Sequence, residues 1–280
     1  MVIDAETNYL YLADTLLTKY PNFWQRFEAV LKVANIPYQF LQNTKDVWAV
    51  DYMPIQLADK AFVQFIYQPS YLQSKYYRST ISNVDEICSS LQIQPSKAAV
   101  KLEGGNIIRS RNSVIMTERV FKENSNISRH KLISQLQELL KVENMCFLPE
   151  LPDDFTGHAD GMLRFLDEKT LLVNDFSKES IEFQQAFKSA IKKGGFDSIE
   201  IPYNVYSNRS IYDANGTYIN YLQMKNLLFI PVFNLPTDDI AVRQLEQLFP
   251  GCKIFPVNCF DIAKKGGVLN CISWNIKKWW

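Results

Sequence analysis

Histidine is the scarcest ionisable residue of this sequence, and one of its two copies lies where catalysis could use it. His130 falls in an expected charged helix, where a solvated position is the plain interpretation. His158 lies in Gly157-His158-Ala159-Asp160-Gly161, and glycine allows sharp turns and the close approach of other groups. Residues two apart in an extended segment face the same side, so His158 and Asp160 are expected to point into one space. A metal site is one alternative, although no third ligand is evident nearby, and an Asp that merely orients a structural His is the other.

A second candidate is the aspartate in Trp48-Ala49-Val50-Asp51-Tyr52-Met53-Pro54. The surrounding segment, Val47–Leu57, is mostly apolar and is expected to be a strand. A carboxylate in such a strand costs free energy unless it is paired, so Asp51 is predicted to meet a cation or strong hydrogen-bond donors. An aspartate that caps the end of the strand is the alternative.

Two glycine pairs adjoin the remaining candidates, Glu103 and Cys271. Glu103 ends an expected strand in Lys101-Leu102-Glu103-Gly104-Gly105-Asn106, where a solvated turn carboxylate is the plainer interpretation of this motif alone. Cys271 follows Gly266-Gly267 within the expected last strand, Val268–Ile276. A buried cysteine in a strand is normally inert packing, but the paired glycines suggest an approach path to its sulfur.

The segments that must position these residues repeat along the chain as two strands in a hairpin, a helix and a further strand. The expected elements of four units are Val47–Leu57 with Ala61–Tyr67, Val84–Leu91 and Ala98–Leu102; Asn106–Ile108 with Ser113–Thr117, Ser128–Val142 and Met145–Leu148; Gly161–Phe165 with Thr170–Asn174, Glu179–Lys193 and Ser198–Pro202; and Thr217–Gln223 with Leu227–Phe233, a helix after Thr237 and Lys253–Val257. The fifth unit combines Val268–Ile276 with the N-terminal segments Tyr9–Leu12, Asn22–Val33 and Tyr38–Leu41.

This repeat predicts a single α/β domain over residues 1–280. Each unit would bury its apolar faces against its neighbours, and closure into a ring would remove unpaired strand edges. We therefore expect a closed five-bladed α/β propeller of ββαβ units around a central channel. The candidate carboxylates and the thiol would fall near strand ends of different blades, at one end of that channel. A two-domain α/β protein with accidental periodicity is the alternative.

The composition argues against several classes of partner. Lys plus Arg and Asp plus Glu both total 30, so the formal charge is zero and nothing calls for nucleic acid or an anionic membrane. No apolar run is long enough to span a membrane, and Met1–Leu12 does not resemble a signal peptide. The five cysteines are scattered without a C-x-x-C pair, so neither zinc spacing nor a disulfide framework is expected. We expect a cytoplasmic protein in which a free thiol can serve as a reagent.

Taken together, the four motifs resemble those of the agmatine deiminase and bacterial peptidylarginine deiminase family of guanidino-modifying enzymes. The family's GGxxHC-(I/M)-T segment is matched by Gly266–Ser273, its G-H-x-D-G motif by Gly157–Gly161, its W-x-R-D-x-x-P motif by Trp48–Pro54 and its E-G-G motif by Glu103–Gly105. The motifs occur in the family's order, and the likeness spans nearly the whole chain. The resemblance implies the five-bladed, pentein-type ring of that family.

The resemblance also implies a mechanism. Asp51 and Asp160 would hold a guanidinium, whose planar N–H donors suit paired carboxylates, over the sulfur of Cys271. The thiolate would attack, and His158 would protonate the departing ammonia and then activate water. Glu103 would orient His158. The implied activity is a cysteine-dependent hydrolase that converts a guanidinium to a ureido product through a thiouronium intermediate, with no metal or organic cofactor.

Three further residues, Trp48, Gly267 and Asn270, are implied as substrate contacts. Three positions depart from the family pattern, because Val50 stands where the family commonly has Arg, Met53 where it often has Gly and Asn270 where it often has His. Val50 loses a charge that could have neutralised the neighbourhood of Asp51, so the sequence defines the chemistry better than the substrate.

The expected partner is a small cationic guanidine such as agmatine, which would place the protein in polyamine biosynthesis. Peptidyl-arginine is less favoured because no signal peptide is recognised. Amidinotransfer to an amine, and a non-catalytic ring that binds a cationic guanidine, are the alternatives. Assembly into a homo-oligomer is left open.

Overall fold

The computed structural model describes residues 1–279, and their strands form five three-stranded sheets. In spatial order the strands of the sheets are β15 (Ser273–Ile276), β1 (Tyr9–Ala13) and β2 (Tyr38–Leu41); β3 (Ile55–Ala58), β4 (Ala61–Ile66) and β5 (Ser96–Lys101); β6 (Ile108–Arg109), β7 (Ser113–Thr117) and β8 (Asn144–Leu148); β9 (Leu163–Phe165), β10 (Thr170–Asn174) and β11 (Asp197–Ile201); and β12 (Leu222–Met224), β13 (Leu227–Val232) and β14 (Lys253–Asn258). In every sheet the middle strand is antiparallel to the first strand and parallel to the third.

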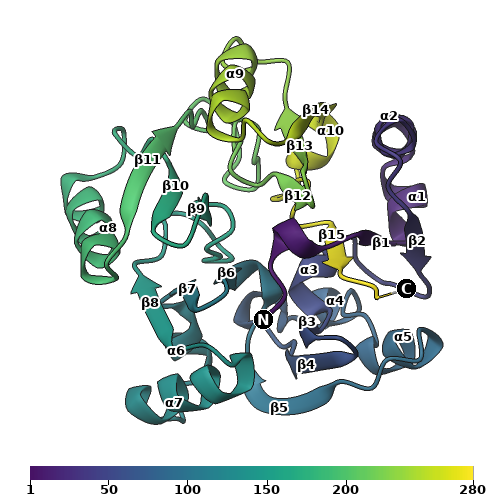
Figure 1. The fold of residues 1–280 in the computed structure, drawn as a ribbon. Coiled ribbons are helices and arrows are strands. Elements are labelled where there is room, and N and C mark those ends of the chain that lie inside the picture. Colours follow the sequence, from purple (N-terminus) through teal and green to yellow (C-terminus); the bar gives the residue numbers. More distant parts are fainter. Residues whose placement is uncertain (280) are drawn as a thin grey trace.

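A helix connects each pair of parallel strands, because a parallel connection needs a crossover. These helices are α2 (Pro21–Val33), α5 (Val84–Ser90), α7 (Arg129–Leu140), α8 (Ile181–Lys193) and α9 (Asp238–Leu248). They lie on the outside of sheets that surround a common centre (Figure 1). The structure therefore confirms a mixed α/β fold built from the expected repeat. Within residues 1–279, every helix is too short or too polar to span a lipid bilayer.

Shorter helical turns occupy the connections. They are η1 (Asp4–Glu6), α1 (Thr15–Lys19), α3 (Ala49–Tyr52), η2 (Ser70–Leu72), α4 (Lys75–Arg78), η3 (Gly104–Asn106), α6 (Arg119–Glu123) and α10 (Phe260–Ala263). The turns η1, η2, α3 and η3 contribute residues to the site described below.

Helix α8 illustrates how the repeat holds together. Phe183, Phe187 and Ile191 recur at four-residue spacing and are all buried, so one stripe of the helix faces its sheet. The Oγ of Ser180 accepts a hydrogen bond from the backbone N–H of Phe183 and caps the first turn. The helix ends at Lys193 and is followed by Gly194. Apolar clusters of this kind fill the spaces between the sheets and their helices.

The two ends of the chain meet in one sheet, as the repeat predicts. Strand β1 pairs antiparallel with β15, with Tyr9 opposite Ile276 and Leu12 opposite Ser273. The first and last segments thereby complete the fifth unit, and the N-terminal segment reaches the centre of the arrangement of sheets (Figure 1).

The expected strand Val47–Leu57 is wrong in its first half. Residues 49–52 form the helical turn α3, with the N–H of Met53 donating to the carbonyl of Ala49, and the strand begins only at Ile55. Pro54 explains the boundary, since a residue before proline is driven out of the helical region and Met53 is extended. Asp51 therefore projects from a helical turn rather than from a strand.

The expected last strand, Val268–Ile276, is also shorter than predicted. The strand begins at Ser273, and the segment before it folds back so that the N–H of Ile272 donates to the carbonyl of Val268. The backbone N–H of Asn270 bonds to the carbonyl of Asn220 in the neighbouring unit. Cys271 accordingly lies on a turn in front of a strand, which leaves its side chain free to face the centre.

Candidate active site

The five residues singled out for chemistry come from four units and converge at the centre. Asp51 lies on α3, Glu103 follows β5, His158 and Asp160 lie in the loop between β8 and β9, and Cys271 precedes β15. Each is buried, with an exposed fraction between 2% for Asp160 and 8% for Asp51 and Cys271. Their burial removes the alternative of a solvated turn carboxylate at Glu103.

His158 lies between two carboxylates. Its Nε2 is 3.0 Å from Oε2 of Glu103, and its Nδ1 is 3.5 Å from Oδ1 of Asp51. Burial opposes a charge on the imidazole, but the two carboxylates outweigh it and raise the pKa of His158 to about 10. The ring is therefore an imidazolium at neutral pH, with Nε2 held by Glu103 and Nδ1 facing Asp51.

Asp51 is the carboxylate of this group whose ionisation is opposed by burial and by its acidic neighbours. Burial raises the pKa of its carboxyl group to about 8 against the opposing effect of His158, and the charges of Glu103 and Asp160 add to the rise. The backbone N–H of Gly105 donates to Oδ1 of Asp51 at 3.0 Å. The site thus gathers more negative than positive groups, which suits a cationic ligand.

Cys271 is surrounded by hydrogen-bonding partners rather than by apolar packing. Its thiol donates to Oδ2 of Asp160 at 3.4 Å, and the side-chain amide of Asn220 donates to its sulfur at 3.3 Å. Burial, followed by the charges of Asp160 and Asp51, raises the pKa of the thiol well above its ordinary value. The thiol is protonated in the free protein, so a nearby cation would be needed to favour the thiolate.

Asp160 and His158 both line one cavity. The cavity measures about 440 Å³, and His158, Asp160, Asn220 and Cys271 lie at its inner end. Asp51 and Glu103 are not among its lining residues and contact His158 instead.

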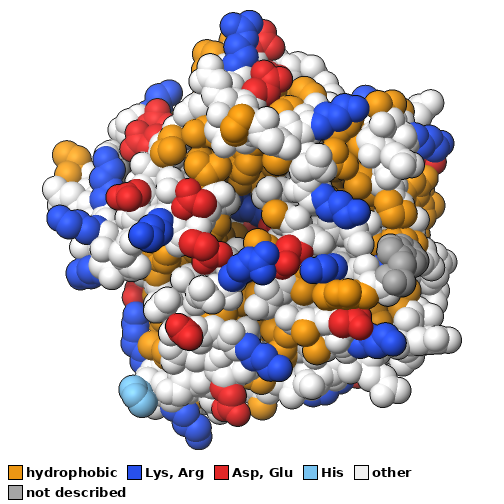
Figure 2. Space-filling model, viewed as in Figure 1, with side chains coloured by type: hydrophobic (Ala, Val, Ile, Leu, Met, Phe, Trp, Pro, Cys, Tyr) orange, Lys and Arg blue, Asp and Glu red, His pale blue; other side chains and the backbone are white. Residues whose placement is uncertain are grey.

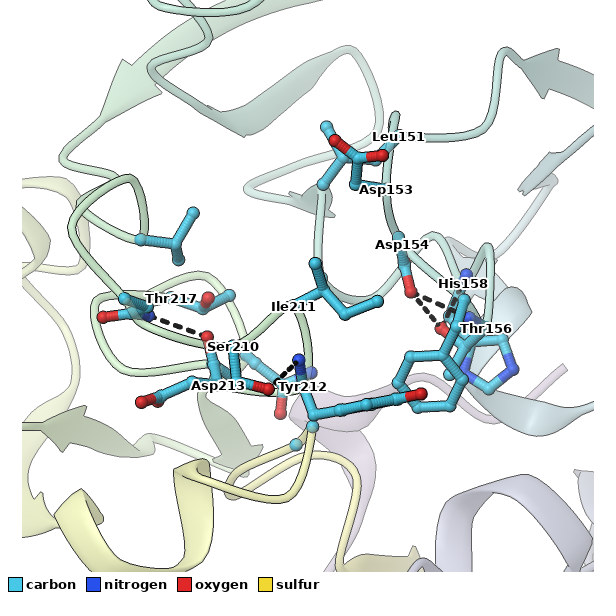
Figure 3. A pocket seen from close by; sticks show the side chains of 18 of the residues that line it. Leu151, Asp153, Asp154, Thr156, His158, Ser210, Ile211, Tyr212, Asp213 and Thr217 are labelled. Atoms are coloured by element: carbon cyan, nitrogen blue, oxygen red, sulfur yellow. Dashed lines mark hydrogen bonds between the residues drawn. The ribbon is translucent and has the colours of Figure 1, made fainter.

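The outer wall of the cavity is formed by two loops, residues 151–156 and 203–217. In Figure 3, Ser210 to Thr217 lie across from Leu151 and Asp153, and the ring of Tyr212 extends toward the loop that carries His158. That ring packs on Phe155 with centroids 4.9 Å apart. The residues that line the cavity include both carboxylates and aromatic rings: Asp153, Asp154, Phe155, Glu179, Tyr203, Tyr206, Tyr212 and Asp213.

Of the three predicted substrate contacts, Gly267 lines the cavity beside Cys271, and Trp48 and Asn270 do not line it. A Cβ added to Gly267 would stand 2.9 Å from the sulfur of Cys271 and 2.8 Å from the ring of Trp48, so only glycine fits this close approach. Trp48 is half-buried, approaches the same point beside Gly267 and is not among the residues that line the cavity. Asn270 lies behind Asp160, to which its Nδ2 donates at 2.7 Å, and it does not line the cavity.

Three residues at the site escaped the sequence analysis. Tyr71, on η2, donates its hydroxyl to Oε1 of Glu103 at 2.5 Å, and no motif surrounds it. The side-chain amide of Asn220 donates to the sulfur of Cys271. Asn220 is a polar residue between apolar and aromatic neighbours in Tyr218–Tyr221, which is the signal that could have found it. Arg164 follows the His158 segment and is buried with 5% exposure, and a charge inside a short apolar strand is the signal that could have found it.

The arrangement does not resemble a metal centre. Among residues 1–279, no group of three or more His, Cys, Asp and Glu side chains has the geometry to hold a metal ion. The chemistry on offer is a buried thiol, a charged imidazole and carboxylates, which together suit attack on a cationic carbon centre.

Comparison with known proteins agrees with these motifs. The family described as Porphyromonas-type peptidyl-arginine deiminase matches residues 12–276. A Listeria monocytogenes protein provisionally named agmatine deiminase 1 is 23% identical over 210 residues, which cover 63% of this chain. The match spans 58% of the length of that relative.

Solved structures resemble the fold over nearly the whole chain. The agmatine deiminase of C. jejuni superposes with a TM-score of 0.79 at 21% identity, covering 98% of this chain and 94% of that chain. DDAH of Pseudomonas aeruginosa superposes with a TM-score of 0.60 at 14% identity, covering 96% of this chain and 99% of that one.

The charge of His158 can be tested directly because the chain has two histidines. We expect Glu103→Gln to lower the pKa of the His158 imidazole by about 1 to 3 pH units, since the variant removes the anion bonded to Nε2. The measurement is a titration of the ring resonances by NMR. His130, which is exposed on α7, is the internal reference and should not respond. An unchanged titration of His158 would contradict the assigned role of Glu103.

Proposed function

Because this chain belongs to the Porphyromonas-type peptidyl-arginine deiminase family, we propose that it hydrolyses a guanidinium group to a ureido group and ammonia. The observation that carries the proposal is the convergence of the Cys271 thiol, the His158 imidazolium and the carboxylates of Asp51 and Asp160 in one buried cluster. We assign Cys271 as the nucleophile and His158 as the proton carrier.

Binding and activation follow from the charge of the site. A guanidinium offers planar N–H donors, and Asp160, which lines the cavity, can accept them directly. Asp51 lies beside His158 and does not line the cavity in the free protein, and we assign it as a second acceptor once the cation has entered. The positive charge of the guanidinium favours ionisation of both Asp51 and the Cys271 thiol, whose pKa values are raised in the free protein. Protons therefore leave to solvent as the cation enters, and the thiolate forms only when substrate is present.

The turnover steps use the two nitrogens of His158 differently. The Cys271 thiolate attacks the central carbon and forms a tetrahedral adduct, and Nδ1 of His158 gives its proton to the nitrogen that departs as ammonia. A thiouronium remains on the sulfur. The neutral imidazole then takes a proton from water, and the resulting hydroxide attacks the same carbon. The second adduct loses its hydroxyl proton to solvent as the C–S bond breaks, which releases the ureido product and the thiolate. Glu103, bonded to Nε2, keeps the ring oriented throughout.

The cavity favours a small guanidine with a second cationic group, such as agmatine. Its volume of about 440 Å³ suits a short chain, and its outer wall carries Asp153, Asp154, Glu179 and Asp213 among aromatic rings. Burial raises the pKa of Glu179, and the positive charge of a bound amine would lower that pKa again by stabilising the carboxylate. The relative from Listeria, with its name of agmatine deiminase, supports this choice, and peptidyl-arginine is the less favoured substrate.

We further propose that residues 1–280 form one catalytic domain in which the five sheets close into a five-bladed, pentein-type ring. The pairing of β1 with β15 supports closure, since it joins the two chain ends in one sheet. The arrangement of the sheets around a common centre supports it as well (Figure 1).

The activity is tested with a panel of guanidino compounds, including agmatine, arginine and a peptidyl-arginine. We expect ammonia and a ureido product from a small guanidine, and a loss of at least about 10⁴-fold in kcat for Cys271→Ala, because the nucleophile is gone. Ammonia release and product mass are the measurements. Cys252→Ala, which removes a half-buried thiol outside the site, should leave kcat unchanged.

Two outcomes of this panel would overturn the proposal. A product carrying the amidine on an added amine would indicate amidinotransfer instead of hydrolysis. Binding of guanidines without ammonia from any member of the panel would leave a cation-binding ring without turnover.

The exchange of protons for a cation predicts the pH dependence of binding. In Cys271→Ala, which cannot turn over, we expect guanidine affinity to fall as pH decreases below about 8, approaching tenfold per pH unit, because a proton on Asp51 competes with the cation. Calorimetry in buffers of different ionisation enthalpy should detect the proton released on binding. Asp51→Asn in the same background should bind weakly at every pH, with a flattened profile. Affinity independent of pH in the parent variant would refute the role of Asp51.

A further inference from the structure

A chain of hydrogen bonds runs from Asp160 away from the cavity to the N-terminal turn η1. Nδ2 of Asn270 donates to Oδ2 of Asp160 at 2.7 Å, the carboxylate oxygen that also lies 3.4 Å from the sulfur of Cys271. Nη1 of Arg164 donates to Oδ1 of Asn270 at 2.7 Å. Nη2 of Arg164 donates to Asp4, which begins η1.

The direction of these bonds determines which way the amide of Asn270 faces. A guanidinium can only donate, so Arg164 requires the amide oxygen of Asn270 on its own side. The amide NH₂ is thereby turned to Asp160, where it donates to a carboxylate. A flipped amide would instead present its oxygen to that carboxylate. Arg164 therefore orients the side-chain amide that donates to the carboxylate of Asp160, whereas the amide of Asn220 donates to the backbone carbonyl of Asp160.

Arg164 in turn depends on Asp4. The guanidinium is buried, and a buried cation is costly unless a carboxylate pairs with it. Burial opposes ionisation of Asp4, but Arg164 and Arg109 outweigh it and lower the pKa of its carboxyl group below the ordinary value. Arg109 donates to the other oxygen of Asp4 at 3.0 Å. Asp4 thus bridges β6 and β9 across the centre of the molecule.

This network reaches the site from the side opposite the substrate. Asp4, Arg164, Asn270 and Val50 border a separate cavity of about 110 Å³, which includes none of the residues proposed to react. The N-terminal segment lies near the centre of the view in Figure 1, and oppositely charged side chains adjoin one another near the centre of the same face in Figure 2.

We propose that Asp4 and Arg164 are positioning residues, which fix the amide of Asn270 and through it the carboxylate of Asp160 next to Cys271. Neither residue touches the substrate. The consequence for turnover rests on the deiminase activity proposed above, but the consequence for the Cys271 thiol does not.

The chain supplies a matched control. Glu6 lies on the same short turn as Asp4 and is also a carboxylate in ion pairs, but its partners are Arg111 and Lys277, at 3.1 Å and 3.5 Å, rather than Arg164. Asp4→Asn and Glu6→Gln each remove one negative charge from η1, so a general effect on the N-terminal segment would appear in both. An effect through Arg164 would appear in Asp4→Asn alone.

The first measurement is the rate of Cys271 alkylation by iodoacetamide as a function of pH, with Cys271 resolved from the other thiols by peptide mass spectrometry. The charged groups that act on this thiol are Asp51, Asp160 and Arg164. Asp4→Asn leaves the charge of Arg164 uncompensated, so the profile should move to lower pH. Arg164→Met removes that charge, so the profile should move to higher pH, while Glu6→Gln should match the parent. If Asp4 and Arg164 only stabilised the fold, the two variants would not shift the pH profile of Cys271 alkylation in opposite directions.

The second measurement is steady-state kinetics on the best substrate of the panel. Asp4→Asn should lose about tenfold or more in kcat/KM, with a fall in kcat as well as a rise in KM, because Asp160 is misplaced in both the bound state and the transition state. Glu6→Gln should stay within about twofold. Matching alkylation profiles and kinetics in Asp4→Asn and Glu6→Gln would overturn the proposal, even if Arg164→Met fails to fold. Shifted profiles without turnover of any guanidine would preserve the network and refute the deiminase activity.

Discussion

The architecture of the site depends on one electrostatic constraint, the burial of several carboxylates around a single imidazole. Within residues 1–279 the ion pairs of Asp51 and Glu103 are both with His158. Charges removed from water must be compensated, and here compensation from within the protein is incomplete. The raised pKa of Asp51, the raised pKa of His158 and the protonated thiol of Cys271 all follow from that imbalance. A planar cation that binds in this cluster would compensate the excess negative charge.

The fold limits the cost of this imbalance by placing polar backbone and side-chain groups at strand ends. Gly105 donates its N–H to Asp51 and its carbonyl accepts from the N–H of Asp160, so one glycine turn joins two units at the site. The hydroxyl of Tyr71 satisfies the second oxygen of Glu103. A Cβ on Gly105 would stand 2.6 Å from both Asp51 and His158, which explains why the turn after Glu103 needs glycine at this position.

Sequence reasoning succeeded where a pattern is local and failed where a contact crosses units. The ββαβ repeat was predictable because apolar spacing and turn residues are local signals, as in α8 and its sheet. The strand expected over Val47–Leu57 failed because its apolar residues suit a helical turn equally well, and the bond from the N–H of Val50 to the carbonyl of Cys271 is a tertiary contact. No spacing pairs His158 with Glu103, and only the family resemblance led to the expectation that Glu103 orients His158. The contact of Tyr71 with Glu103 was missed because the segment of Tyr71 contains no motif.

The contacts of Val50 and Asn270 show what these two positions, which depart from the family pattern, contribute to the site. Position 50 contributes mainly backbone to the site, because its N–H bonds to Cys271 and its carbonyl lies where a Cβ on Gly104 would otherwise stand. Its side chain borders the rear cavity together with Arg164. Arg164 brings a cation from β9 to this cavity, and Asn270 links it to Asp160 because an amide can accept from a guanidinium and donate to a carboxylate at once.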